Sequence, residues 1–255
     1  MAPVDTRLIE GQGTTEAQWL AWPGLMQIPV VAAATLVPPA CRVVVVAPHP
    51  DDEILMVGGL LQYMLRLARN VQLVAVTDGT TSHAGSTDWP RERLLSERPR
   101  ESHAALETLG LPVEPMLRLR LRLADGELKQ LQPQLVEQIA HVIRPRDVVF
   151  TTWRHDGHPD HEATGHACAT VAGHVGAKLI EVPVWAWHWA CPGDARLPWH
   201  RARRLVLDDA AVQRKQEAVK AFISQLLPDF STGAGPVLRS TTVARAARSF
   251  EMMFV

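Results

Sequence analysis

A run of β-branched residues, RVVVVA at residues 42–47, is the feature that most constrains the fold of this chain. The run is bounded by prolines and is apolar on both faces, which is typical of a strand buried at the centre of a parallel sheet. Stretches of similar apolar character follow at residues 71–77 and 147–152. Because parallel strands need long crossover connections, the chain should place helices between its strands.

The segments between these strands have helical periodicity, and the later part of the chain adds further strands. We expect helices at residues 53–69, 91–110, 131–143 and 161–175, and strands at residues 113–123, 178–185 and 203–207. Strands that alternate with helices of this length predict an α/β fold, with a mostly parallel, doubly wound sheet and helices on both faces.

The beginning of the chain differs from the rest. Residues 1–40 lack clear periodicity, so we expect an N-terminal lead-in that packs on the domain, with Trp19 and Trp22 as anchors. No linker-like stretch divides residues 41–255, and we expect them to form a single domain.

Composition limits the classes of partner. The chain has 26 basic and 27 acidic residues and a formal net charge of -1, so no overall field favours nucleic acid or an anionic membrane. Cys41, Cys168 and Cys191 are odd in number and form no CxxC pair, which argues against a disulfide framework and a thiolate zinc site. A small neutral or locally charged molecule is the better expectation.

The sequence also predicts the compartment. The longest apolar stretch, residues 28–41, contains three prolines and is too short to span a bilayer. The N-terminus lacks a basic stretch leading into an apolar core, so it does not resemble a secretory signal. We therefore expect a cytoplasmic protein without a membrane span.

Two loops rich in histidine and aspartate follow the strands at residues 42–47 and 147–152. The first carries PHPDDE at residues 48–53, and the second carries WRHDGHPDH at residues 153–161. In open α/β sheets, chemistry gathers at the carboxyl ends of the strands, so we expect both loops at the same edge.

The side chains of these loops form a candidate metal site. His49 and Asp52 are three residues apart in a turn that enters a helix, and His161 can supply a third ligand. Zinc prefers imidazole and carboxylate ligands, and a catalytic zinc site uses three protein ligands and leaves one position open. The same ligand set also suits iron(II), so ligand type does not fix the metal.

Three further side chains have the chemistry that amide hydrolysis needs. A bound metal can make water acidic enough to act as a nucleophile near neutral pH. Asp51, beside Asp52, suits a general base that takes a proton from this water and later passes it to the leaving amine. His158, when protonated, can stabilise the oxyanion of the tetrahedral intermediate. Asp156 is placed to orient and charge the His158 ring.

Each motif also has a simpler explanation. A histidine in a loop is usually a surface residue, and a proline next to an acid often marks only a turn. Two such clusters, each ending a buried strand, favour a metal site. We expect the remaining histidines to be structural or solvated, among them His83, His103, His141, His166, His174 and His188.

The two loops resemble the motifs of the PIG-L/LmbE family of zinc-dependent N-acetylglucosaminyl deacetylases. Members carry a PHPDDE-type motif after the first strand and an HPDH motif further on, and both are intact here at residues 48–53 and 158–161. Weaker similarities extend over most of the chain beyond residue 40. They include TDG at 77–79, Arg98 and Glu101 ahead of Leu109 and Gly110, DG at 125–126, and Lys215 to Ser224 and Gln225.

This resemblance implies a Rossmann-like fold and hydrolysis of an N-acetylglucosamine-type acetamide. It implies His49, Asp52 and His161 as zinc ligands, Asp51 as the base and His158 as the electrophilic helper. The expected partner is a small-molecule amino-sugar conjugate. The family includes enzymes for glycolipid precursors, thiol-cofactor precursors, thiol conjugates and antibiotic sugars, so the sugar and its attached group stay open. Whether the chain forms a homo-oligomer also stays open.

Other side chains have two explanations each. Arg98 resembles a family arginine that faces the sugar or its aglycone, and a salt bridge on a helix surface explains it equally well. Trp185, Trp187 and Trp189 could stack on a sugar ring, although we favour one buried face of a strand. The arginines within residues 118–122 could bind a phosphate, although a solvated strand face is the commoner explanation.

Other functions fit parts of the same pattern. A metal-dependent phosphoesterase would use similar ligands but often two ions, so one ion per chain favours an amidase. An amidase that cleaves a thiol-conjugate amide also stays open. A dinucleotide-binding oxidoreductase is disfavoured because PHPDDE stands where GxGxxG would be required. A binding module with a structural metal would not need Asp51 and His158.

Overall fold

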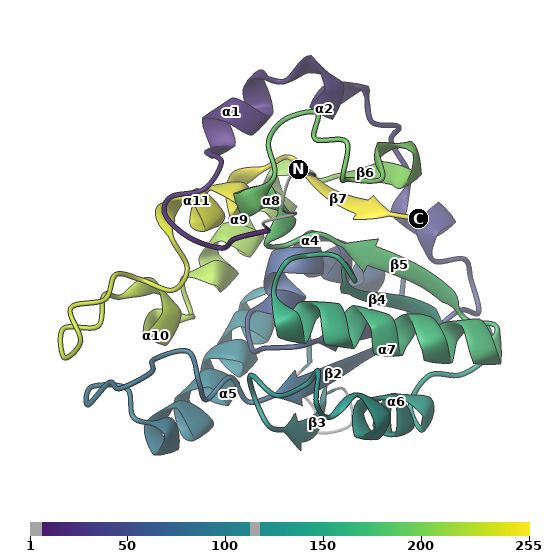
Figure 1. The fold of residues 1–255 in the computed structure, drawn as a ribbon. Helices are drawn as coiled ribbons and strands as arrows, with labels where there is room; N and C mark the ends of the chain where they lie inside the picture. The colour runs from purple at the N-terminus through teal and green to yellow at the C-terminus, as the bar shows by residue number, and fades with distance from the viewer. Residues whose placement is uncertain (1–6, 113–117) are drawn as a thin grey trace, which may run out of the picture.

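A seven-stranded sheet with helices on both faces forms the centre of the computed structural model, which describes residues 7–112 and 118–255 (Figure 1). The strands lie in the order β3-β2-β1-β4-β5-β7-β6. Their bounds are β1 (Val43–Ala47), β2 (Val71–Thr77), β3 (Arg118–Leu123), β4 (Val148–Thr152), β5 (Lys178–Val182), β6 (Ala202–Val206) and β7 (Phe250–Phe254).

The direction of the strands matches the predicted fold class. The five strands from β3 to β5 pair in parallel, whereas β7 runs antiparallel to both β5 and β6. The strand order reverses at β1, which lies between β2 and β4. The predicted doubly wound, mostly parallel α/β sheet is confirmed, and β1 lies at its topological switch point.

Most helices follow a strand and return the chain along a face of the sheet. The principal helices are α4 (Asp52–Arg66), α5 (Arg91–Thr108), α6 (Gln132–Ala140), α7 (Pro159–Val175) and α9 (Asp209–Val219). Shorter helices are α1 (Glu16–Ala21), α2 (Pro23–Gln27), α3 (Ala33–Leu36), α8 (Ala186–Trp189), α10 (Ile223–Leu226) and α11 (Ser240–Ala244), with 3-10 turns at Trp199–Arg201 and Arg245–Ala247. In the described ranges, no helix has the length and apolar character needed to cross a membrane.

The valines of β1 explain why this strand is central. Val43 and Val45 pack in the core beneath α4, α5 and α9, whereas Val44 and Val46 pack in the core beneath α6 and α7. Successive side chains of a strand point to opposite faces, so an uninterrupted apolar run is needed where helices cover both faces. Figure 1 shows α6 and α7 along one face of the sheet.

The N-terminal segment lies across the β6–β7 side of the molecule (Figure 1). Trp19 is fully buried, and its indole Nε1 donates to the Trp187 carbonyl at 2.9 Å. Two backbone hydrogen bonds of 2.9 Å attach the segment to β6, from Val31 N to Arg204 O and from Arg204 N to Pro29 O. The division into a lead-in at 1–40 and one domain at 41–255 stays a prediction.

The strand expected at residues 178–185 is too long. β5 ends at Val182, and the tryptophan-rich segment forms the short helix α8, so the expected strand face of tryptophans is wrong. The carboxylate of Asp156 explains the change, because it accepts backbone N–H bonds from Val184, Trp185 and Ala186 at 2.9 Å each. These bonds turn the chain away from the sheet directly after β5.

One strand was missed, and the bounds of several other elements differ from the expectation. The last strand, β7, was not predicted from the sequence, although it lies between β5 and β6. Helix α4 begins at Asp52 and ends at Arg66, three residues before the expected end. Of the strand expected at 113–123, β3 covers Arg118–Leu123, and residues 113–117 lie outside the described part of the chain.

We expect Gly165→Ala to destabilise the fold, because α7 crosses closely over the end of β4 at this glycine. A Cβ at position 165 would lie 2.6 Å from the Thr152 carbonyl oxygen and 2.8 Å from the Arg154 backbone nitrogen. Overpacking of this kind costs about 1–3 kcal/mol. Urea unfolding followed by circular dichroism measures the effect.

Gly173→Ala is the matched control on the same helix. A Cβ at position 173 meets nothing within 4 Å. Alanine should therefore leave the free energy of unfolding unchanged or raise it by up to about 1 kcal/mol through its helix propensity. Equal destabilisation by both substitutions would contradict close packing at Gly165 as the cause.

Candidate metal centre

The pairing of β1 with β4 brings the two histidine-rich loops together. The strands are adjacent and parallel, with Val46 opposite Thr151, so both chains leave the sheet at the same edge. The loop after β1 carries His49 and leads into α4, and the loop after β4 leads into α7, which carries His161. The predicted meeting of the two loops at one sheet edge is what the structure shows.

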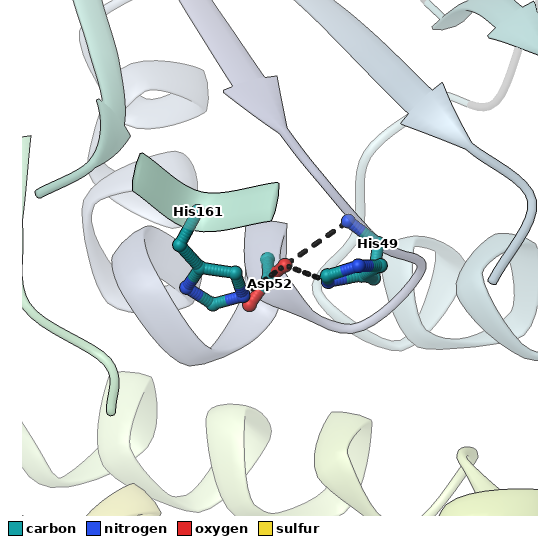
Figure 2. Close-up of side chains that lie close together, drawn as sticks. All are labelled: His49, Asp52 and His161. Carbon is teal, nitrogen blue, oxygen red and sulfur yellow. Dashed lines mark hydrogen bonds and ion pairs between the residues drawn. The ribbon is translucent and has the colours of Figure 1, made fainter. Parts of the chain in front are cut away.

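His49, Asp52 and His161 form a cluster at this meeting point (Figure 2). One candidate ligand atom from each residue lies within 4.8 Å of the other two, and all three residues are buried. Asp52 Oδ2 lies 3.2 Å from His49 Nδ1 and 3.3 Å from His161 Nε2. The three ligand atoms therefore face a common point.

The chemistry of these atoms fits a metal ion. Within residues 7–112 and 118–255, the buried His161 Nε2 has no hydrogen-bond partner, although a buried polar nitrogen normally has one. The other ring nitrogen, Nδ1, lies 2.8 Å from Asp156 Oδ2. A carboxylate only accepts, so Nδ1 carries a proton, and Nε2 can offer its lone pair to an ion once that nitrogen has released its own proton. Two imidazoles and one carboxylate with such a lone pair suit a divalent transition metal.

Charge at the cluster also favours a cation. Burial lowers the pKa of His161, but the carboxylates of Asp52 and Asp156 outweigh it and raise this pKa to about 9. Burial raises the pKa of Asp52, yet the neighbouring rings of His161 and His49 hold it below its ordinary value. The site therefore concentrates buried negative charge around the two imidazoles.

Asp156 does not contact the ring for which we expected it. The sequence suggested that it orients His158, whereas the structure places its carboxylate against His161. Backbone N–H groups after β5 hold this carboxylate, and the Asp156 side chain is fully buried. A carboxylate behind a metal-binding histidine fixes the orientation of the ring and its tautomer.

Asp51 lies beside the cluster in an unusual backbone conformation. Its φ of 142° is rare for a residue other than glycine. Burial raises the pKa of the Asp51 carboxyl to about 7, although the positive charge of Arg98 opposes this shift. A carboxyl group with a pKa near neutrality can both accept and release a proton there.

Arg98 lies on α5 but is buried, so the salt bridge on a helix surface that the sequence also allowed does not form. Its side chain is only 3% exposed and donates to Asp51 Oδ2 at 3.0 Å, to Pro50 O at 2.8 Å and to Gly79 O at 3.0 Å. These bonds join the loop after β1 to the loop after β2. The side chain also borders the cavity at the cluster, so contact with a substrate stays a prediction.

His158 lies at the N-cap of α7, with its ring 4.9 Å from that of His49. Its Nδ1 accepts the backbone N–H of Asp160 at 3.2 Å, so the neutral ring carries its proton on Nε2. Burial, followed by the charges of His161 and His49, lowers the His158 pKa to about 3. The neutral ring therefore offers its Nε2–H as a hydrogen-bond donor, and the electrophilic role of His158 stays a prediction.

A cavity of about 270 Å³ opens at the cluster. The residues of the two motifs line it together with Arg98 and with residues that the sequence did not single out as site residues, namely Thr81, Trp185, Gln225, Val237 and Leu238. Gln225 had a sequence signal in the weaker similarity near the end of the chain, and Trp185 had one as a possible stacking partner for a sugar ring. The other three have no local motif that marks them.

The comparisons with known proteins agree with this arrangement. Residues 44–172 match the PIG-L family model, described as GlcNAc-PI de-N-acetylase. The chain is 33% identical over 136 residues to a Bacillus anthracis protein named "Probable N-acetyl-alpha-D-glucosaminyl L-malate deacetylase 2", over 50% of this chain and 58% of that protein. It therefore spans little more than half of that relative's length.

Two longer matches cover more of the chain. It is 25% identical over 232 residues to the 1D-myo-inositol 2-acetamido-2-deoxy-alpha-D-glucopyranoside deacetylase of Corynebacterium diphtheriae, over 72% of this chain and 76% of that protein. The crystal structure of a deacetylase of the A40926 pseudoaglycone has a TM-score of 0.58 and 23% identity, and the match covers 84% of this chain and 96% of that one. The structural match supports the fold.

The strand order and the cluster of imidazoles and carboxylates at the switch point define an α/β protein with a candidate metal centre. The family model covers half of the chain, including both motifs. The chain belongs to the PIG-L family.

We expect zinc to stabilise the folded protein through this cluster. Free zinc at 100 times its dissociation constant should raise the free energy of unfolding by about 2.7 kcal/mol. His161→Ala should abolish the increase, because it removes the unpartnered Nε2 atom. Thermal unfolding with and without zinc measures both effects.

His166→Ala is the control, because His166 lies exposed on the same helix α7. This variant should keep the full response to zinc. A zinc response that survives in His161→Ala would show that the ion binds elsewhere.

Proposed function

We propose that this chain is a zinc-dependent N-deacetylase that hydrolyses the acetamide of an N-acetylglucosamine-type amino sugar or its conjugate. One observation carries the proposal: the three candidate ligand atoms face one point in a cavity that also contains Asp51, whose carboxyl has a pKa near 7. The names of the two curated relatives support the substrate class, since both are named as deacetylases of N-acetylated glucosamine compounds.

His49, Asp52 and His161 would hold the zinc ion, and the same ligand set would also accept iron(II). When bound, such an ion acts as a Lewis acid that polarises the acyl carbonyl and makes water acidic enough to attack it near neutral pH.

Asp51 and His158 supply the proton chemistry in this proposal. The Asp51 carboxylate takes the proton of the attacking water and delivers it to the amine nitrogen as the C–N bond breaks. The products are acetate and the free amine. The neutral His158 ring donates its Nε2–H to the oxyanion of the tetrahedral intermediate. Asp156 holds the ring of His161 and takes no part in proton transfer.

Arg98 keeps the Asp51 carboxyl in place for these steps. Its guanidinium bridges Asp51 and two backbone carbonyls, so the carboxyl cannot rotate freely. The same positive charge opposes the effect of burial on the Asp51 pKa. This balance keeps the carboxyl able to exchange a proton near neutral pH.

We expect release of free amine from N-acetylglucosamine conjugates, with Asp51→Asn as the decisive variant. Asparagine keeps the size of the side chain and a hydrogen bond to Arg98, but its amide cannot accept a proton. Loss of a general base should lower kcat by about 10²- to 10⁴-fold. A fluorescamine assay of released amine across a panel of conjugates, with and without chelator, measures the activity.

Zinc content separates the possible outcomes. Asp51→Asn should retain the zinc of the wild-type protein, whereas His161→Ala should lose both zinc and activity. Turnover at the wild-type rate by Asp51→Asn would exclude Asp51 as the base. Activity that withstands complete removal of metal would exclude the proposed reaction.

A second cavity explains why the substrate is proposed to be a conjugate. This cavity of about 280 Å³ shares Ser82, Trp185 and Val237 with the cavity at the metal cluster. Small-molecule pockets usually have volumes of about 300–1,000 Å³, so the two cavities together fit a ligand larger than one sugar. His83, Asp229 and Arg239 line only the second cavity and offer polar groups to such an extension.

We expect His83→Ala to raise KM for extended conjugates while leaving KM for free N-acetylglucosamine unchanged. The ring lines only the second cavity, where it also contacts Ser82 Oγ at 2.9 Å. Loss of one hydrogen bond costs about 0.5–1.5 kcal/mol, which corresponds to about a 2- to 10-fold increase in KM. Steady-state kinetics with both substrates measures the difference.

His103→Ala serves as the control, because His103 is an exposed histidine on α5. Equal changes in KM for the short and the extended substrate would count against an aglycone in the second cavity.

A further inference from the structure

The Nε2 atom of His49 faces away from the metal cluster and lies between two carboxylates. It is 3.2 Å from Asp125 Oδ1 and 3.3 Å from Asp160 Oδ2. The opposite ring nitrogen, Nδ1, lies 3.2 Å from Asp52 Oδ2 in the cluster. One imidazole therefore lies between the proposed metal ligands and a separate pair of acids.

Both acids of this pair are held in place. Asp125 Oδ2 accepts the backbone N–H and the hydroxyl of Thr81 at 2.7 and 2.9 Å. Asp160 Oδ2 accepts the N–H of Gly126 at 2.7 Å, and its Oδ1 accepts the N–H of Leu128 at 3.2 Å. Both side chains are buried. Neither carboxylate can turn away from His49 without breaking these bonds.

The pair could hold a second metal ion or could orient His49. His49, Asp125 and Asp160 do bring three ligand atoms within 4.8 Å of one another. An ion there, together with the ion at Asp52, would require His49 to lose both ring protons. Hydrogen bonding requires no such loss, because a carboxylate accepts the Nε2–H directly.

The other ligand histidine favours the orienting role. His161 has one nitrogen at the metal cluster, and its other nitrogen contacts the carboxylate of Asp156. Asp156 is itself held by backbone N–H groups, as Asp125 and Asp160 are. Each ligand ring thus has one nitrogen at the cluster and the other against carboxylate oxygen, one carboxylate for His161 and two for His49, with Nδ1 and Nε2 exchanged.

We propose that Asp125 and Asp160 are positioning residues, which accept the Nε2–H of His49 and so present its Nδ1 lone pair to a single metal ion. Such carboxylates fix the tautomer of a ligand histidine and make it a better electron donor. The inference rests on the metal site of the proposed function but not on its substrate. It also separates this chain from a two-metal phosphoesterase.

We expect Asp125→Asn to weaken zinc binding about 10- to 100-fold, the usual effect of losing such a partner. Asparagine has one acceptor oxygen, so it cannot accept from both Thr81 and His49, and its amide group would face one of these donors. Competition with a chromophoric chelator measures zinc affinity without any substrate. The visible absorption of the cobalt-substituted protein reports the change at the metal.

Asp78→Asn is the matched control, because Asp78 is a buried acid at the same sheet edge that pairs with Arg120. This variant should bind zinc as tightly as the wild-type protein. Unchanged zinc affinity in Asp125→Asn would overturn the proposal. A wild-type protein that binds zinc but releases no amine from any conjugate would instead count against the proposed function.

Two measurements on the wild-type protein test the proposal without depending on the folding of any variant. Metal analysis should give one zinc per chain, and a long-range ¹⁵N–¹H spectrum of the zinc-loaded protein should show His49 protonated at Nε2. Two zinc ions per chain, or a His49 ring without a proton on Nε2, would overturn the proposal and assign the acid pair to a second ion.

Discussion

The parallel pairing of β1 with β4 is the constraint on which the site depends. Both strands are buried on both faces, so a shift of their register would disturb the core on each side of the sheet. This pairing fixes where the loop after β1 and the start of α7 can lie. The distance between His49 and His161 is therefore set by the centre of the fold and not by the loops themselves.

Buried acids are the second property that shapes this edge of the sheet. Asp52, Asp156 and Asp160 are almost fully removed from solvent, and an unpaired buried charge is costly. The fold offsets this cost with backbone N–H donors and with the imidazoles of His49 and His161. A divalent cation would further reduce the cost of burying these carboxylates. The buried negative charge therefore explains both the need for hydrogen-bond donors around the acids and the expected affinity for a metal.

The sequence predicted those parts of the molecule whose signal is local. The apolar run at residues 42–47 and the two motifs that follow buried strands were sufficient for the sheet and for the cluster. The partner of Asp156 could not be predicted, because backbone groups of α8 and the residues before it direct its carboxylate. The contact of Asp125 with His49 likewise could not be predicted. It depends on how closely the segment after β3 approaches the loop after β1, and no sequence motif encodes that distance.

The N-terminal segment covers part of an outer strand of the sheet. β6 is the outer strand of the sheet, and unpaired backbone groups on an outer strand can recruit a strand from another chain. The backbone bonds of Pro29 and Val31 to Arg204 occupy part of that strand, while Trp19 and Leu25 shield the apolar side chains beside it. The segment thus occupies backbone groups of β6 that would otherwise be open to pairing, a role separate from the chemistry proposed at the ends of β1 and β4.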